Sequence, residues 1–497
     1  MTGATTVSTR FEQYLRDATA RAEAVDTATL ATLGLLPTPT EHYLSGTYPP
    51  LKAMDDADEA EVLRGTSAEL NLYVHIPFCR QRCTFCHFAK EIRATEDRVT
   101  AYLDALVHEI ALQAKRLGPR WISSVYFGGG TPSTLTPAEL ERLFGALHEH
   151  FGWTAETEVT FELHPQVVRD RRRLTDQLAV LKSGGVNRIA FGIQSLDDKV
   201  LSTMNRGHTA AEAFALIDFL QHTSFDNVSV DLMYGLPYET TESWFRTLND
   251  IVAAGVEKLN IFPLFLKVTD PISWLYERRP EVFPDGRDRL VSHLITEDYL
   301  RDQGFHSGPV LYYARADHHS RQQASKFDEI DSVNLLGLGV SSFGYLGGTQ
   351  YYNHCDLDTY LSQVMADRLP FWRAFTLPED ELARRNTMFA LRSAGVHRSS
   401  FADRFGAVPE DLLPELKQFA DLGLLELTDD VWRTNEIGAY CIDSMSAQLA
   451  SDDIVQRVRA TNEQIVDPRR NLLEQHDYSP LGRTGASVAR PHGPGRR

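Results

Sequence analysis

The chain has 497 residues, of which 42% are hydrophobic and 24% charged, a balance typical of a globular protein with more than one domain. Acidic residues outnumber basic ones by 68 to 50, so the formal net charge is −18. This acidic excess disfavours a general nucleic-acid binder, because binding to a phosphate backbone requires a basic face.

The N-terminal part, residues 1–68, is acidic and mostly helical in pattern, with proline-containing breaks at 36–40 and 47–50. We expect it to form an extension that packs on the main domain. It lacks the basic start and apolar stretch of a signal peptide, and the chain has no run of 18 apolar residues. These features predict a cytoplasmic protein with no membrane partner.

A regular alternation of strand and helix patterns occupies residues 69–270. Such alternation predicts an α/β fold with a parallel sheet and right-handed crossovers, either open or curled into a full or partial barrel. In both cases the working face lies at the carboxyl ends of the strands. Strands are expected at 72–76, 122–127, 158–163, 188–193, 228–233 and 258–263, and helices near 96–117, 137–151, 173–184, 209–222 and 240–255.

Chemically distinctive residues follow these predicted strands at their carboxyl ends. A group of three cysteines follows the first strand, and the motif GGGTP at 128–132 follows the second. Because parallel strands bring their carboxyl ends to one edge of a sheet, we expect one shared site. The later strands contribute Glu162, Gln194, Asp231 and Phe265 to the same edge.

The remainder of the chain is divided into three parts. Residues 271–375 are less regular and are expected to complete the barrel and the substrate region. Residues 376–466 form a predicted helical domain whose hairpin pattern at 422–434 resembles a winged helix; its acidic residues favour a structural or substrate-covering role over DNA binding. Residues 467–497, rich in Arg, Gly and Pro, are predicted to be a disordered tail.

Three of the five cysteines, Cys79, Cys83 and Cys86, lie within eight residues with the spacing C-x3-C-x2-C. Three thiolates on a tight loop, without a fourth cysteine nearby, suit a [4Fe–4S] cluster with one open iron. A zinc ion completed by His87 or Cys355, or three unrelated buried cysteines, are the alternatives. We interpret Cys355 and Cys441 as packing residues.

The cysteine spacing together with GGGTP after the next strand resembles the radical S-adenosylmethionine (SAM) superfamily. The resemblance implies a partial (β/α)6 barrel and a cluster whose open iron is chelated by SAM. One electron from the cluster then cleaves SAM to methionine and a 5′-deoxyadenosyl radical, which abstracts hydrogen. It also implies an electron donor such as flavodoxin or ferredoxin as a partner.

Four further segments resemble the oxygen-independent coproporphyrinogen oxidase-like (HemN-like) family: YVHIPFC at 73–79, FGIQS at 191–195, DLMYGLP at 231–237 and LLGLGVS at 335–341. The resemblance covers roughly residues 47–460 and includes the C-terminal domain. It implies two bound SAM molecules. It places Tyr73, Gly129, Glu162 and Phe343 around the first, and Phe85, Gly130, Thr131, Gln194, Arg206, Asp231 and Phe265 around the second.

The same residues are also compatible with purely structural roles. The glycines of GGGTP also suit a tight turn, and Glu162 also suits a solvated charge at a strand end. Arg206 can grip a carboxylate and Asp231 an amine or a ribose, but both also suit a buried ion-pair network that holds loops together.

The chain departs from the true oxidase at two places. That enzyme has a fourth cysteine two positions after the triplet, where this chain has Phe88. It also has a Tyr-Thr-Ser-Tyr-Pro-like segment near its N-terminus, where this chain reads TYPPL at 47–51. Both departures turn the expectation away from coproporphyrinogen as the substrate.

Two other subgroups of the family lack the fourth cysteine. The haem chaperones usually also lack a long N-terminal extension and the form DxxLLGxGVS, which this chain has at 331–341. The class C methyltransferases and cyclopropanases keep both SAM sites, and the chain resembles them most. In their implied reaction, the radical from the first SAM removes hydrogen from the methyl group of the second. The methylene radical adds to an sp2 carbon of an unsaturated small molecule, and loss of S-adenosylhomocysteine completes methylation or cyclopropanation. Coproporphyrinogen oxidation and haem trafficking are the alternatives.

Overall fold

The computed structural model describes residues 2–40, 46–225, 227–267, 270–315, 320–322, 325 and 334–464. The tail expected at 467–497 therefore lies outside the described residues. No helix among the described residues combines the length and the apolar character that crossing a membrane requires.

A sheet of 13 strands forms the main body, and its central seven strands run parallel in the order β12-β2-β5-β6-β7-β8-β9. All six strands expected from the sequence are present, so the predicted parallel α/β fold is confirmed. The parallel strands are β2 (Glu69–Ile76), β5 (Trp121–Gly129), β6 (Glu158–Leu163), β7 (Arg188–Gln194), β8 (Asn227–Tyr234), β9 (Lys258–Pro263) and β12 (Asn334–Leu338).

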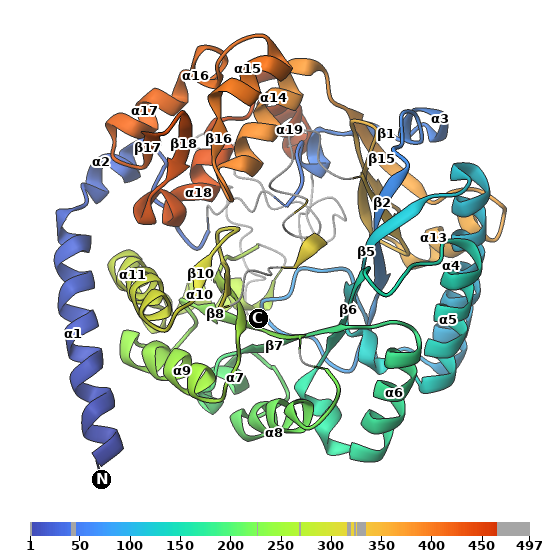
Figure 1. Ribbon diagram of the computed structural model, residues 1–497, viewed down its shortest axis with the longest axis horizontal. Coiled ribbons are helices and arrows are strands. Elements are labelled where there is room, and N and C mark those ends of the chain that lie inside the picture. The colour runs from blue at the N-terminus through green and yellow to red at the C-terminus, as the bar shows by residue number, and fades with distance from the viewer. Residues whose placement is uncertain are drawn as a thin grey trace, which may run out of the picture.

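Helices lie around the outside of the curved sheet (Figure 1). Each has an apolar stripe that packs on the strands, and local signals fix its ends. For example, Thr95 caps the start of α4, and Gly118 ends it with a positive φ. The helices between the parallel strands are α4 (Glu96–Leu117), α5 (Pro137–His150), α6 (Arg171–Ser183), α7 (Asp198–Thr203), α8 (Ala210–Gln221) and α9 (Thr241–Ala253).

The strand β12 lies within the less regular residues 271–375 that were expected to complete the barrel, and its partner could not be named from the sequence. In the structure it pairs in parallel with β2, although more than 250 residues separate Leu338 from its register partner Val74. An antiparallel extension then continues the sheet on this side through β13 (Phe343–Leu346), β14 (Thr349–Asn353), β15 (Phe371–Thr376) and β1 (Asp55–Asp56). On the other side β11 (Tyr312–Ala314) and β10 (His306–Ser307) follow β9.

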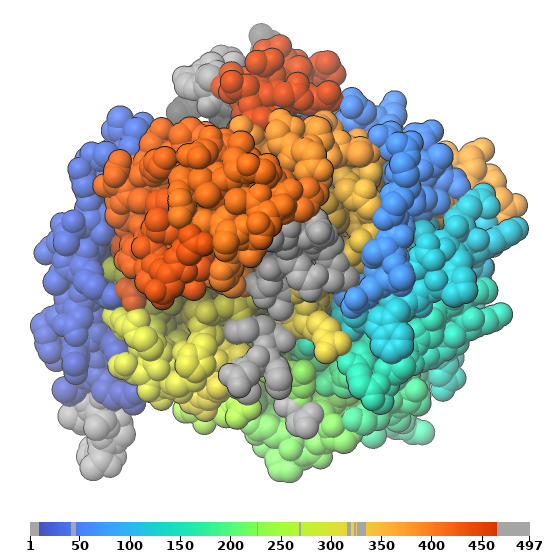
Figure 2. Space-filling view, turned by 45° about the horizontal axis from the view of Figure 1, so that its top comes forward, coloured from blue at the N-terminus to red at the C-terminus, as the bar shows by residue number. Residues whose placement is uncertain are grey.

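The C-terminal domain closes the gap between the two edges of the sheet (Figure 1), and Figure 2 shows it as an orange-to-red block above the yellow and green elements of the barrel. Its three short strands pair in the order β16-β18-β17 and form the wing expected from the sequence. The domain contains α14 (Glu379–Ala390), β16 (Val396–His397), α15 (Arg398–Phe405), α16 (Pro409–Leu412), α17 (Glu415–Asp421), β17 (Leu425–Thr428), β18 (Val431–Thr434), α18 (Glu436–Gln448) and α19 (Asp452–Gln464).

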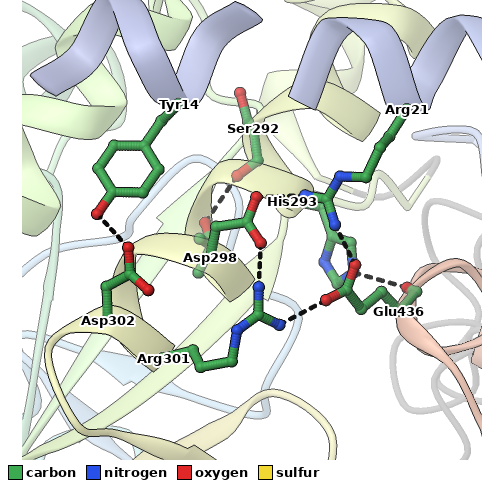
Figure 3. A network of polar contacts seen from close by, with 9 residues as sticks. Tyr14, Arg21, Ser292, His293, Asp298, Arg301, Asp302 and Glu436 are labelled. Carbon is green, nitrogen blue, oxygen red and sulfur yellow. Dashed lines mark hydrogen bonds and ion pairs between the residues drawn. The ribbon is translucent and has the colours of Figure 1, made fainter. Parts of the chain in front are cut away.

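The N-terminal extension holds the barrel and the C-terminal domain together. Its helix α1 (Thr2–Ala24) packs along α11 (Gly286–Asp302), which belongs to the barrel. Arg21 of α1 pairs with both Asp298 of α11 and Glu436 of α18, and Arg301 pairs with the same two carboxylates (Figure 3). This closed ring of four charges links three parts of the chain, and Tyr14 adds a hydrogen bond of 2.7 Å to Asp302.

A buried carboxylate fixes the loop that follows β12. Glu109 of α4 is fully buried and accepts hydrogen bonds from the Gly339 N–H at 2.8 Å, the Tyr360 hydroxyl at 2.6 Å and the Asn353 amide at 2.9 Å. A Cβ at Gly339 would lie 2.8 Å from the carbonyl oxygen of His75. The network thus holds this loop against the carboxyl end of β2, where the cysteine loop begins.

We expect the stability of the chain to depend on the ionisation of Glu109. Burial raises the pKa of Glu109 from 4.5 to about 7. Protonated Glu109 therefore stabilises the fold fully below pH 4.5. About 3 kcal/mol of the free energy of unfolding is lost as the pH rises from 4.5 through 7. In Glu109→Gln this loss should be absent, so the free energy of unfolding of the wild type, measured in urea between pH 5 and 8, should fall relative to the variant. Parallel pH profiles for the two proteins would contradict the prediction.

Candidate active site at the carboxyl ends of the strands

The three clustered cysteines lie on a loop that starts where β2 ends. The short strands β3 (Phe78–Cys79) and β4 (Glu91–Ile92) pair with each other and close this loop at its base. Inside it, the ammonium group of Lys90 donates hydrogen bonds to the carbonyl oxygens of Cys86 at 2.6 Å and Phe88 at 2.8 Å. The pairing of β3 with β4 and the Lys90 side chain therefore hold the loop in a fixed conformation.

The surroundings of the thiols fit an iron–sulfur cluster. Burial raises the pKa of Cys79 to about 11, so a thiolate forms here only with a cation nearby. The Cys79 sulfur lies 3.4 Å from the Thr131 hydroxyl, and the Arg206 guanidinium donates to the Cys83 sulfur at 3.4 Å. Hydrogen bonds to sulfur are one of the means by which proteins tune such clusters. Among the described residues no three His, Cys, Asp or Glu side chains converge on a single metal ion, whereas a cluster accepts more widely spaced ligands.

A cavity of about 180 Å³ extends from the cysteines across the carboxyl ends of the strands. All three cysteines and most of the polar residues expected at the strand ends line it. We refer to it as the cluster cavity. Its lining includes Cys79, Cys83, Cys86, Phe85, Gly129, Gly130, Thr131, Glu162, Gln194, Arg206 and Asp231.

The glycines after β5 are required by close packing against the cysteine loop. Gly129 has φ +108°, and a Cβ there would lie 2.6 Å from the His75 ring. A Cβ at Gly130 would lie 2.7 Å from the carbonyl group of Pro77, which is backbone and has no room to move. The Gly130 N–H also donates to the carbonyl of Ile76 at 2.8 Å. This arrangement is compatible with the tight turn considered from the sequence and also with a ligand close to the backbone of Gly129.

We expect Gly130→Ala to disrupt the cluster cavity. Because the added methyl group meets backbone, the variant should lose about 1–3 kcal/mol of unfolding free energy. It should also bind SAM at least about tenfold more weakly, which is a loss of about 1.4 kcal/mol of binding free energy. Isothermal titration calorimetry and thermal unfolding measure the two effects.

Gly145→Ala is the matched control, since a Cβ at this position in α5 meets no atom within 4 Å. The control should be more stable than the wild type by up to about 1 kcal/mol, because alanine favours a helix. Normal SAM affinity in Gly130→Ala would refute the close-packing argument.

Two partly buried carboxylates, Glu162 and Asp231, line the cluster cavity. Glu162 accepts a hydrogen bond from the Tyr126 hydroxyl at 2.7 Å, and Asp231 accepts one from the Asn260 amide at 2.7 Å. Burial, with a further contribution from the charge of Asp231, raises the pKa of Glu162 to about 8; burial also raises the pKa of Asp231. Two such carboxylates favour a ligand that carries a positive charge or hydroxyl groups.

Gln194 has an unusual backbone conformation, and the side chain of Arg206 is fixed by its contacts. Gln194 ends β7 with φ +73°, a left-handed conformation that is uncommon for a residue with a side chain and often marks a functional site. The Arg206 guanidinium donates to the carbonyl of Gly192 at 2.5 Å, besides its contact with the Cys83 sulfur. The guanidinium is thus fixed between the cysteine loop and β7.

A second cavity of about 230 Å³ lies beside the first and is more apolar. Tyr73 and Phe343 stack in its wall with ring centroids 5.7 Å apart, and they meet because β12 brings its following strand next to β2. We refer to it as the aromatic cavity. Its lining is Gly46, Asn71, Tyr73, Phe88, Tyr126, Gly129, Glu162, Gln322, Leu335, Phe343, Tyr345, Gln350 and Arg385.

The two cavities divide the predicted site residues into two sets. The aromatic cavity contains the whole set expected around the first SAM: Tyr73, Gly129, Glu162 and Phe343. The cluster cavity contains the set expected around the second SAM, except Phe265, whose ring lies 5.1 Å from that of His87. Phe265 is not among the residues that line either cavity, so its role stays a prediction. Gly129, Glu162 and Phe88 belong to both linings.

Several lining residues were missed by the sequence analysis. Tyr126 was detectable, because strand alternation places it on the same face as Gly128. Arg385 was not detectable, since it reaches the aromatic cavity from the C-terminal domain; its guanidinium lies 3.8 Å from the Tyr345 ring centroid. His164 follows Glu162 and lines the cluster cavity, and burial lowers its pKa well below the usual value.

Comparisons with known proteins agree with this geometry. Residues 73–251 match the family described as the radical SAM superfamily, and residues 377–440 match the HemN C-terminal domain. A relative named oxygen-independent coproporphyrinogen III oxidase, from Escherichia coli, is 29% identical over 353 residues, which cover 66% of this chain and 73% of the relative. A relative named heme chaperone HemW, from Bacillus subtilis, is 25% identical over 356 residues, which cover 71% and 92%.

The solved structure of coproporphyrinogen III oxidase (HemN) from Escherichia coli, described as a radical SAM enzyme, also matches. The match has a TM-score of 0.70 at 25% identity and covers 86% of this chain and 98% of that structure. The similarity therefore extends over the barrel and the C-terminal domain together.

Proposed function

The chain belongs to the radical SAM superfamily, in the branch with a HemN C-terminal domain, and we propose that it cleaves SAM reductively at a cluster held by Cys79, Cys83 and Cys86. The observation that carries this proposal is that all three thiols line one cavity with Glu162, Gln194, Arg206 and Asp231. When bound, a [4Fe–4S] cluster supplies the electron that splits SAM into methionine and a 5′-deoxyadenosyl radical.

The chain's own residues bind and orient SAM in this proposal. The backbone of Gly129 allows close approach, and Glu162 offers its carboxylate to ribose hydroxyls or to an amino group. The rings of Tyr73 and Phe343 provide an apolar wall for an adenine. Phe88 lines both cavities and contributes an apolar surface to each.

For the overall reaction, the names of the relatives favour oxidation of a coproporphyrinogen. In such a reaction a hydrogen atom leaves a propionate side chain to the 5′-deoxyadenosyl radical. The side chain then loses carbon dioxide and one electron to an external acceptor, and a vinyl group remains. The relatives thereby support this reaction better than the methyl transfer expected from the sequence.

Methylation or cyclopropanation with a second SAM is the other candidate. Its support is the division of the predicted residues between two adjacent cavities, together with Phe88 in the place of the fourth cysteine of the oxidase. In this reaction a second SAM, held by Gln194, Arg206 and Asp231 in the cluster cavity, gives a methylene group to the substrate. One further electron from the external donor closes the resulting radical, and the SAM leaves as S-adenosylhomocysteine. The substrate then occupies the remaining part of the aromatic cavity.

Anaerobic reconstitution with iron and sulfide, followed by dithionite and SAM, tests the common part of the proposal. We expect 5′-deoxyadenosine, and its absence from a protein with a full cluster would refute reductive cleavage. Addition of coproporphyrinogen III then separates the candidates: a divinyl product with carbon dioxide supports the oxidase. Formation of S-adenosylhomocysteine with extracts of unsaturated metabolites supports the transferase. Stable haem binding without either product would support haem trafficking instead.

A further inference from the structure

A buried arginine lies within the barrel, at the amino-terminal side of the candidate active site. Arg188 is the first residue of β7, the strand between β6 and β8, and 3% of its surface is exposed. Its guanidinium donates hydrogen bonds to the hydroxyl of Thr160 on β6 at 3.2 Å and to that of Ser229 on β8 at 2.8 Å. The side chain of Arg188 therefore joins three neighbouring strands.

The two residues that Arg188 contacts precede the two carboxylates of the cluster cavity. Glu162 follows Thr160 by two positions on β6. Asp231 follows Ser229 by two positions on β8. Because alternate residues of a strand lie on one face of a sheet, both carboxylates are on the face that carries the guanidinium. Arg188 itself is not among the residues that line the cluster cavity or the aromatic cavity, so it acts on a ligand there through these carboxylates.

The charge of Arg188 affects the ionisation of both carboxyl groups. Burial raises the pKa of Glu162 and of Asp231, and the charge of Arg188 opposes this by lowering the pKa of each. A buried guanidinium is costly unless a negative charge offsets it. The two hydroxyl groups that accept its hydrogen bonds are neutral, so the carboxylates next to them supply that negative charge.

We infer that Arg188 is a positioning residue that favours the ionised forms of Glu162 and Asp231 and so supports their binding of positive charge or hydroxyl groups. This inference rests on the proposed function, because the ligand with these groups is SAM. The hydrogen bonds to β6 and β8 hold the guanidinium at a fixed place beside the two strands that carry the carboxylates. The alternative is that Arg188 only fastens the three strands to one another.

The other titratable groups near the two carboxylates act differently from Arg188. Arg206 acts on Asp231 from the side of the cysteine loop, where it also contacts the Cys83 sulfur. Three tyrosines face the carboxylates from other strands, and burial raises the pKa of each, so they stay neutral between about pH 6 and 10. They are Tyr73 of β2, Tyr126 of β5 and Tyr312 of β11.

The test replaces Arg188 by glutamine in the reconstituted enzyme, since glutamine can still bond the two hydroxyl groups and has no charge. The infrared band of protonated Glu162, identified by its loss in Glu162→Gln, reports the pH at which this residue ionises. In Arg188→Gln we expect this pH to rise by at least about one unit, because a neighbouring cation lowers a carboxyl pKa by about 1–3 units. The pH at which the Kd for SAM levels off, measured by calorimetry without reductant, should rise with it.

Three further variants complete the experiment. Arg188→Lys keeps a positive charge and should ionise Glu162 at a pH closer to that of the wild type. Arg172→Gln is the matched control, since Arg172 is exposed on α6 and is not among the lining residues of either cavity. It should leave the ionisation of Glu162 unchanged. Arg188→Met removes the same charge and is measured instead if Arg188→Gln does not fold.

An unchanged ionisation of Glu162 in the neutral variant would overturn the inference and leave Arg188 with a structural role. An equal rise in Arg188→Lys would also overturn it, because the shape of the side chain and not its charge would then be responsible. Absence of 5′-deoxyadenosine from the wild type with dithionite would refute the proposed function. The infrared titration would still decide the role of Arg188, because it does not require SAM.

Discussion

Replacement of Cys86 by alanine should reduce reductive SAM cleavage at least about a hundredfold, since even the loss of a residue that only supports a metal ligand costs up to that much. The three thiols stand on one short loop, and Phe88 occupies the position at which the related oxidase has a further cysteine. The loop therefore offers no further cysteine to replace Cys86. Burial raises the pKa of the Cys86 thiol, so this thiol depends on iron to become a thiolate.

The measurement combines iron and sulfide content, visible absorbance of the cluster and 5′-deoxyadenosine formed with dithionite. Cys441→Ala is the matched control, because Cys441 is fully buried in α18 and distant in sequence from the cysteine loop. The control should keep its iron and its activity. Wild-type iron content and 5′-deoxyadenosine formation in Cys86→Ala would contradict the cluster assignment.

Asp231→Asn should separate SAM cleavage from product formation. Asp231 lines the cluster cavity but not the aromatic cavity, and its carboxylate is the only charged group that the change removes. If a second SAM binds there, the loss of one charged hydrogen bond should lower product formation about ten- to a hundredfold. Cleavage of the first SAM should continue and give 5′-deoxyadenosine without product.

Liquid chromatography of both products from one reaction provides the measurement, and Asp176→Asn, an exposed residue of α6, is the control. Burial raises the pKa of Asp231, so product formation by the wild type should rise with pH as this carboxyl ionises. The variant should lack that rise. Equal losses of 5′-deoxyadenosine and product would argue against a separate second SAM and in favour of a single reacting site.

The N-terminal extension, which precedes the barrel in the chain, reaches the aromatic cavity. After α1 and the ring of charges around Arg21, the extension continues to Pro39, whose carbonyl accepts a hydrogen bond of 2.7 Å from the Leu266 N–H. Gly46 then lines the aromatic cavity. The extension was expected from the sequence only to pack on the main domain, and its approach to the cavity follows from contacts between distant segments.

The sequence by itself determined the parallel α/β barrel, the cysteine loop and the residues at the strand ends. These features depend on local order: the alternation of strand and helix patterns sets the fold class, and parallel strands bring their carboxyl ends to one edge. The cysteine spacing likewise acts within one loop. Glu162, Gln194 and Asp231 therefore lie in one cavity as expected.

The tertiary structure alone decided which residues meet across long separations. The pairing of β12 with β2 brings Phe343 onto Tyr73, and the C-terminal domain brings Arg385 to the same cavity. The packing of the loop after β9 places Phe265 against His87 and away from both cavity linings. Such contacts depend on how whole elements pack, because residues separated by hundreds of positions share no local pattern. The division of one predicted site into two adjacent cavities is therefore a property of the folded chain.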